Sequence, residues 1–149
     1  MIPLVLITGF LGSGKTTLLR RIAEQNRQRK QVFLVNELSS VDVDGRQLAS
    51  GCENVVSLPG GSIFCKCLVT SFIGQMREIA AKYDLPGDPL DMLIVEASGI
   101  TDPTVAGRML AETKLDAVYR LAKIVCVIDP GSFLKLLHTL PNILAQVES

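Results

Sequence analysis

The chain has 149 residues, a length that suits one domain with a hydrophobic core of its own. Hydrophobic residues make up 48% and charged residues 20%, which is typical of a folded globular protein and excludes a disordered one. Lys and Arg together number 15, as do Asp and Glu, so no net charge favours nucleic acid or an anionic membrane as a partner.

The first predicted element is an apolar strand at residues 2–8, and a phosphate-binding motif follows it directly. Residues 9–16, GFLGSGKT, match the P-loop pattern G-x-x-x-x-G-K-[ST] between this strand and a predicted helix. Glycine permits the backbone conformations that turn successive N–H groups toward phosphate oxygens. Lys15 adds a charge for the outer phosphates, and the Thr16 hydroxyl is a ligand for Mg²⁺. The residues expected to bind the nucleotide are Gly9, Gly12, Ser13, Gly14, Lys15, Thr16 and Thr17.

The helix after the P-loop has apolar residues at helical spacing and is expected to end in the basic cluster at residues 27–30. We interpret this cluster as a solvated helix end, since cations there complement the helix dipole. A second strand is predicted at residues 31–36. Residues 37–58 are polar and rich in turn-forming residues, as in a long functional or flexible loop. Asp42 and Asp44 lie in this loop as candidates for a first switch, and Asp44 is the preferred one.

Two cysteines follow the Gly60-Gly61 turn, just before a predicted helix with an apolar stripe from Leu68 to Tyr83. Cys65 and Cys67 form a C-x-C pair that can converge on one soft cation such as Zn²⁺, which would need two further ligands. Inert buried cysteines would give the same spacing. The best additional donors in the chain are Glu37, Cys52 and His138.

The second half of the chain begins with a turn at residues 85–89 and an apolar strand at residues 91–96. A helix at about residues 104–112 and another strand at residues 123–128 follow, and Cys126 is interpreted as a small core residue of that strand. Residues 132–149 are expected to be helical and broken at Pro141.

Strands that alternate with helices predict an α/β fold, here a three-layer α/β/α P-loop NTPase sandwich with a mostly parallel sheet. Ligands of such sheets bind beyond the carboxyl ends of the strands. The P-loop, Glu37 and residues 96–99 each follow a predicted strand, so we expect them to meet at one edge of the sheet.

Glu96 ends an apolar strand, where P-loop proteins keep the carboxylate that holds Mg²⁺ directly or through water. Three residues later, the N–H of Gly99 can contact a γ-phosphate. The catalytic residues are therefore predicted to be Lys15, Thr16, Glu96, Asp44 and Gly99, and the Mg²⁺ ligands Thr16, Glu96 and Asp44.

Several motifs together resemble the CobW-type GTPases, metallochaperones similar to the GTPases that mature hydrogenase and urease. These motifs are the P-loop with Thr17, the Asn36-Glu37 pair, the Gly60-Gly61 turn before the cysteines, and residues 96–99 with Asp102-Pro103. The family's cysteine motif resembles G-C-x-C-C, whereas Ser62 and Phe64 stand at its first two cysteines, Cys65 matches the third and Cys67 is an addition. The guanine-reading Asn-Lys-x-Asp loop of the family does not occur in this chain.

The resemblance implies Mg²⁺-dependent GTP binding, slow hydrolysis, and delivery of Zn²⁺, Co²⁺ or another transition metal to a client protein or a cofactor-biosynthesis enzyme. Cys65, Cys67 and Glu37 would bind the cargo metal. Residues 1–149 would form an incomplete P-loop GTPase domain without the family's C-terminal domain, and a homodimer is a further expected assembly. A cytoplasmic location is expected from the cysteine usage and from the absence of an apparent leader. Two alternatives stay open: a P-loop kinase of small molecules, and a non-catalytic nucleotide-sensing module of an assembly that inserts or reactivates a metal cofactor.

Overall fold

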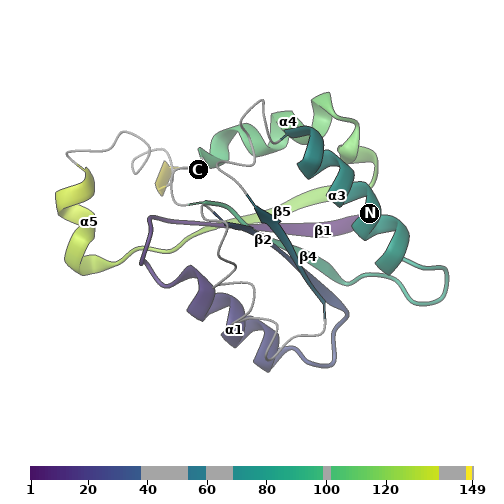
Figure 1. Cartoon of the computed structure of the whole chain (residues 1–149), viewed down its shortest axis with the longest axis horizontal. Coiled ribbons are helices and arrows are strands. Elements are labelled where there is room, and N and C mark those ends of the chain that lie inside the picture. Colours follow the sequence, from purple (N-terminus) through teal and green to yellow (C-terminus); the bar gives the residue numbers. More distant parts are fainter. Residues whose placement is uncertain (38–53, 60–68, 99–101, 138–146, 149) are drawn as a thin grey trace.

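A five-stranded parallel sheet organises the computed structural model, which describes residues 1–37, 54–59, 69–98, 102–137 and 147–148 (Figure 1). The strand order is β3-β2-β4-β1-β5, and every neighbouring pair is parallel. The strands are β1 (Ile2–Thr8), β2 (Gln31–Glu37), β3 (Val55–Pro59), β4 (Met92–Glu96) and β5 (Tyr119–Cys126). Central strands such as β1 and β4 are buried on both faces, which explains their continuous apolar sequences.

Helices cover both faces of this sheet. Figure 1 shows α1 (Lys15–Gln25) on one side and α3 (Val69–Tyr83) with α4 (Ala106–Glu112) on the other. One apolar cluster, which includes Ile7, Leu19 and Ile94, lies between the sheet and α1. The other, which includes Leu6, Phe72 and Met109, lies between the sheet and α3 and α4. The predicted three-layer α/β/α architecture is therefore confirmed.

Shorter elements complete the chain after β4. The 3₁₀ helix η1 (Pro103–Val105) precedes α4, and η2 (Leu115–Ala117) follows it. The last helix with several turns, α5 (Pro130–Leu137), projects from one end of the sheet (Figure 1). In the described ranges, no helix is long and apolar enough to cross a lipid bilayer.

Four sequence-based boundaries were wrong. Residues 55–59 form the edge strand β3, although the whole of residues 37–58 was interpreted as a loop. Strand β5 begins at Tyr119 and ends at Cys126, not at residues 123–128. Helix α1 ends at Gln25, so the basic residues 27–30 follow the helix instead of forming its last turn. The C-terminal helix starts at Pro130, and residues 138–146, which include Pro141, lie outside the described residues.

Lys30 shows what part of that basic cluster does. Its backbone N–H donates to the Asp91 carboxylate over 2.8 Å, and its ammonium pairs with the Asp88 carboxylate and donates to the Asp88 carbonyl. These contacts join the start of β2 to the turn before β4. They lie at the amino edge of the sheet, opposite the edge where ligands bind to parallel sheets.

Tyr119 provides a test of the packing between β5 and α3. Its side chain is buried, and its hydroxyl donates a 2.7 Å hydrogen bond to the Met76 carbonyl. Burial raises the pKa of Tyr119 above its ordinary value, so the phenol stays neutral and keeps donating. We expect Tyr119→Phe to lower the free energy of unfolding by about 1–2 kcal/mol, because the Met76 carbonyl loses a buried donor. Urea denaturation would measure this loss, and an unchanged transition midpoint would contradict the assignment.

Candidate functional site

The P-loop joins β1 to α1 at the carboxyl edge of the sheet. Gly9, Gly12 and Gly14 have φ angles of 132°, 78° and 98°, values that other residues rarely adopt. Gly14 is the N-cap of α1 and is left-handed, and no side chain caps the helix there. The first N–H groups of a helix have no partner within it, so the start of α1 is suited to an anion.

The Lys15 side chain lies inside the curve of this loop. It is only 7% exposed, and its Nζ donates to the Gly9 carbonyl over 2.9 Å and to the Phe10 carbonyl over 3.2 Å. A buried ammonium needs several acceptors to offset its lost hydration. Lys15 is therefore positioned where phosphate oxygens would come within reach of the P-loop amides.

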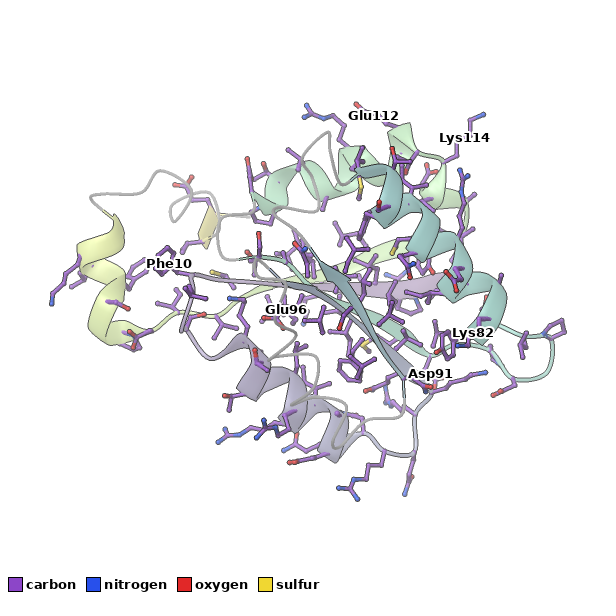
Figure 2. The ribbon with its side chains drawn as sticks, in the orientation of Figure 1. Phe10, Lys82, Asp91, Glu96, Glu112 and Lys114 are labelled. Carbon is purple, nitrogen blue, oxygen red and sulfur yellow. The ribbon has the colours of Figure 1, made fainter. Side chains whose placement is uncertain are left out.

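The Glu96 carboxylate lies at the same edge and on the α1 side of the sheet. It ends β4, is 5% exposed, and is in register with Ile7 on β1 and Val35 on β2. Ile94, two residues earlier, packs in the cluster beneath α1, so strand alternation turns Glu96 to the same face. Figure 2 places Glu96 between the sheet and α1. The fold thus brings Glu96 toward the helix that begins with Lys15 and Thr16.

Three buried oxygen atoms around this edge make no hydrogen bond within the part of the chain that the structure describes. They are Thr8 Oγ1, Ser13 Oγ and Asn36 Oδ1. A buried polar atom without a partner costs about 1–3 kcal/mol, and such atoms are rare unless a ligand or water meets them. The buried Lys15 ammonium, the uncapped helix amides and the Ser13 hydroxyl can meet phosphate oxygens, and the buried Glu96 carboxylate can meet Mg²⁺, so the α1 side of this edge fits a phosphate ligand that carries Mg²⁺.

Several predicted site residues lie outside the described residues. These are Asp44, Gly99, Cys65 and Cys67, together with the weaker candidates Asp42, Cys52 and His138. Glu37 is the last residue of β2 and is in register with Pro59 at the end of β3. Within the described ranges, no three His, Cys, Asp or Glu side chains cluster as metal ligands do. The cargo-metal site therefore stays a prediction.

Cys126 is a correction to the sequence analysis. It is half-buried instead of belonging to the core, and it is a free thiol. Burial raises the pKa of the Cys126 thiol, and the positive charge of Lys15 opposes that shift. The thiol therefore stays protonated at neutral pH, which makes it a poor metal ligand.

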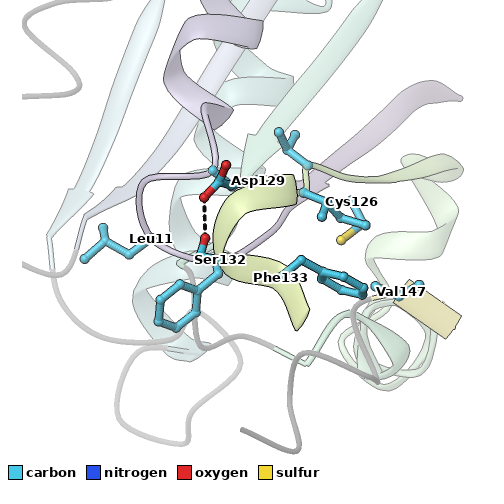
Figure 3. A pocket seen from close by; sticks show the side chains of 10 residues that line it. Leu11, Cys126, Asp129, Ser132, Phe133 and Val147 are labelled. Atoms are coloured by element: carbon cyan, nitrogen blue, oxygen red, sulfur yellow. Dashed lines mark hydrogen bonds between the residues drawn. The ribbon is translucent and has the colours of Figure 1, made fainter. Parts of the chain in front are cut away.

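A mainly apolar pocket lies beside the P-loop, between it and α5 (Figure 3). Phe10, Leu11, Cys126 and Phe133 help to line it. Asp129 marks the start of α5: its carboxylate accepts hydrogen bonds from the Ser132 hydroxyl and the Gly131 N–H, which lower its pKa. Ser13 of the P-loop lines this pocket, whereas Lys15 and Glu96 are not among the described residues that line it, so the pocket shares one wall with the phosphate-binding arrangement.

Two features of the edge were not predicted from the sequence. Gly9 packs so closely on the chain after β5 that a Cβ there would lie 2.2 Å from the Val127 carbonyl oxygen. Asn36 appeared only as part of a motif, although a buried amide at the end of an otherwise apolar strand is a recognisable signal. No local pattern indicates the first contact, because the two residues are far apart in the sequence.

The chain matches a known protein family over nearly its whole length. The family described as CobW/HypB/UreG, nucleotide-binding domain, matches residues 3–147. The chain belongs to this family. The zinc chaperone CobW of Pseudomonas aeruginosa is 35% identical over 111 residues, which cover 68% of this chain and 28% of that protein. The zinc chaperone YeiR of Escherichia coli is 33% identical over 126 residues, 84% of this chain and 37% of that protein.

A eukaryotic relative extends the match. The zinc-regulated GTPase metalloprotein activator 1 of Saccharomyces cerevisiae is 29% identical over 147 residues, 91% of this chain and 32% of that protein. The matches span from 28% to 37% of the length of these three curated relatives. The resemblance to CobW-type GTPases is therefore confirmed as membership of the CobW/HypB/UreG family. The buried P-loop lysine and the strand-end carboxylate lie within the matched residues.

Proposed function

We propose that this chain is the P-loop GTPase domain of a metallochaperone, which binds GTP with Mg²⁺, hydrolyses it slowly, and couples its nucleotide state to a transition metal. The observation that carries the proposal is the buried Lys15 ammonium inside the P-loop, with the Glu96 carboxylate at the end of β4 on the same side of the sheet. Both residues belong to a chain of the CobW/HypB/UreG family. Zn²⁺ is the first choice of cargo because two of the compared relatives are named zinc chaperones, and Co²⁺ is the second. Delivery to a metal-requiring client in the cytoplasm, and a homodimer, complete the proposal.

The described residues have separate proposed roles at the nucleotide. Lys15 and the amides at the start of α1 would hold the phosphates, since both present positive charge where the anion lies. Thr16 and Glu96 would hold Mg²⁺, which neutralises negative charge on the phosphates during hydrolysis. Asp44 and Gly99 are proposed as the residues that sense the γ-phosphate. Without an arginine supplied by a partner, hydrolysis by this class is slow, about 10⁻⁴ to 10⁻² per second.

The cargo site is proposed at Cys65, Cys67 and Glu37. Its support is the register between the ends of β2 and β3, which places Glu37 beside the strand that leads toward the cysteines. Thiolates are strong ligands for Zn²⁺ and must lose their protons to bind it. A small shift of either strand end would therefore change the metal affinity.

A Zn²⁺ titration of the reduced protein tests this function. We expect the Zn²⁺ affinity to differ between GDP and a non-hydrolysable GTP analogue, and Cys65→Ser and Cys67→Ser each to weaken it more than about 10-fold, because each removes a ligand. Competition with a chromogenic chelator would measure both effects. Cys126→Ser is the matched control and should leave the affinity unchanged, since that thiol is half-buried and protonated. Unchanged affinity in both Cys65 and Cys67 variants would exclude the cargo site.

A further inference from the structure

Asn36 connects the two strand ends that the proposed function requires to communicate. It is the residue before Glu37 on β2 and is 5% exposed. Its Nδ2 donates a 3.2 Å hydrogen bond to the Leu58 carbonyl of β3, the residue with which it is in register. The preceding residue, Val35, is in register with Glu96 on β4. Asn36 thus lies between the strand that ends in the proposed Mg²⁺ ligand and the strand that leads toward the cysteines.

The orientation of the Asn36 amide follows from the hydrogen bond that its side chain makes with Leu58. Only the NH₂ group can donate to the Leu58 carbonyl, so the amide oxygen has to point away from β3. That oxygen is buried and has no hydrogen-bond partner among the described residues. A buried acceptor in this state has a strong preference for any donor that reaches it.

Asn36 and Glu96 face opposite sides of the sheet. Leu34, two residues before Asn36, packs in the cluster beneath α3 and α4, so strand alternation turns Asn36 to that face. The same alternation from Leu6 places Thr8, whose Oγ1 is also buried and without a described partner, on that face of β1. Two acceptors therefore flank the end of β4 on the side away from the Lys15 and Glu96 arrangement.

We propose that Asn36 is the positioning residue that couples the nucleotide to the cargo metal. This inference rests on the proposed function. Its Nδ2 hydrogen bond holds the end of β3, the strand after which the cysteines follow in the sequence. Its Oδ1 takes up a water or a backbone N–H that the triphosphate-bound state brings to this edge. Filling Oδ1 favours the amide orientation that holds Leu58. One hydrogen bond of ordinary strength changes an equilibrium constant by about 3- to 10-fold, and this sets the size of the coupling.

The coupling is measured as a ratio of two dissociation constants for Zn²⁺, one with GDP and one with the non-hydrolysable GTP analogue. We expect a ratio that departs from 1 by about 3- to 10-fold in the unaltered protein and falls to about 1 in Asn36→Leu. Leucine has a similar volume and no polar atoms, so it removes both hydrogen-bonding roles with little change in packing. Zn²⁺ affinity without nucleotide, and nucleotide affinity without Zn²⁺, should each stay within about 3-fold. Reciprocity requires Zn²⁺ to change the preference for the analogue over GDP by the same ratio.

A matched control is Gln31→Leu, because Gln31 is a buried polar residue at the opposite end of the same strand. Its ratio should equal that of the unaltered protein. Circular dichroism would establish whether each variant is folded. If Asn36→Leu does not fold, Asn36→Ala replaces it in the same measurement. A folded Asn36 variant that keeps the full ratio overturns the inference, as does an equal loss in Gln31→Leu. A ratio of 1 in the unaltered protein instead overturns the proposed coupling of nucleotide and metal itself.

Discussion

Replacing Lys15 by alanine is expected to weaken GTP binding at least about 100-fold, which corresponds to about 3 kcal/mol. The Lys15 ammonium is almost fully buried and lies against the P-loop carbonyls of Gly9 and Phe10. Charge-assisted hydrogen bonds in such a site are about twice as strong as neutral ones, and alanine leaves the phosphate oxygens without their cation. Titration with a fluorescent GTP analogue in the presence of Mg²⁺ would measure the loss.

The matched control is Lys82→Ala. Lys82 is in the last turn of α3, where its ammonium lies 5.1 Å from the Tyr83 ring centroid and far from Glu96 in Figure 2. It changes the net charge by the same amount as Lys15→Ala, so it separates a local contact from a general electrostatic effect. We expect its GTP affinity to stay within about 2-fold of that of the unaltered protein, since exposed charges contribute little. Near-normal GTP binding by a folded Lys15→Ala variant would contradict the placement of the phosphates.

The central strands could be predicted from the sequence because the fold buries them on both faces. β1 and β4 are continuous apolar runs, and each leads directly into a motif at the carboxyl edge. The edge strands gave a weaker signal. In β5, exposed Arg120 and Lys123 interrupt the apolar residues, so only its second half resembles a buried strand. β3 has five residues and pairs with one neighbour. Its exposed Ser57 interrupts the apolar pattern, so the strand resembles the polar segment before it.

The residues of the site also differ in how far the sequence alone could predict them. The residues of the P-loop are adjacent in sequence, so their spacing alone indicated the phosphate-binding loop, and Glu96 followed from its place at a strand end. Thr8 could not be distinguished from other polar residues, and Asn36 stood out only through its place at the end of an apolar strand, because the significance of both depends on burial and on the absence of a described partner. Cys126 was misjudged because an apolar neighbourhood in sequence does not indicate whether a strand end is covered.

The contact between Gly9 and Val127 predicts a large loss of stability in Gly9→Ala. The added Cβ would lie 2.2 Å from the Val127 carbonyl oxygen, a backbone atom that cannot rotate away, and the φ of 132° is unfavourable for alanine. Backbone strain of about 1–3 kcal/mol and a similar cost of overpacking together predict a loss of at least about 3 kcal/mol in the free energy of unfolding. Thermal and urea denaturation would measure it.

Gly12→Ala separates these two costs, because Gly12 also has a positive φ, 78°, but a Cβ there would meet no atom within 4 Å. We expect it to lose only about 1–2 kcal/mol, the strain of a left-handed alanine. The Val127 N–H also donates to the Thr8 carbonyl over 2.8 Å, so the chain just after β5 contacts both Gly9 and the residue before it. If Gly9→Ala is no less stable than Gly12→Ala, close packing of the chain after β5 does not stabilise the P-loop. The conformation of the loop would then depend on the backbone freedom of its glycines.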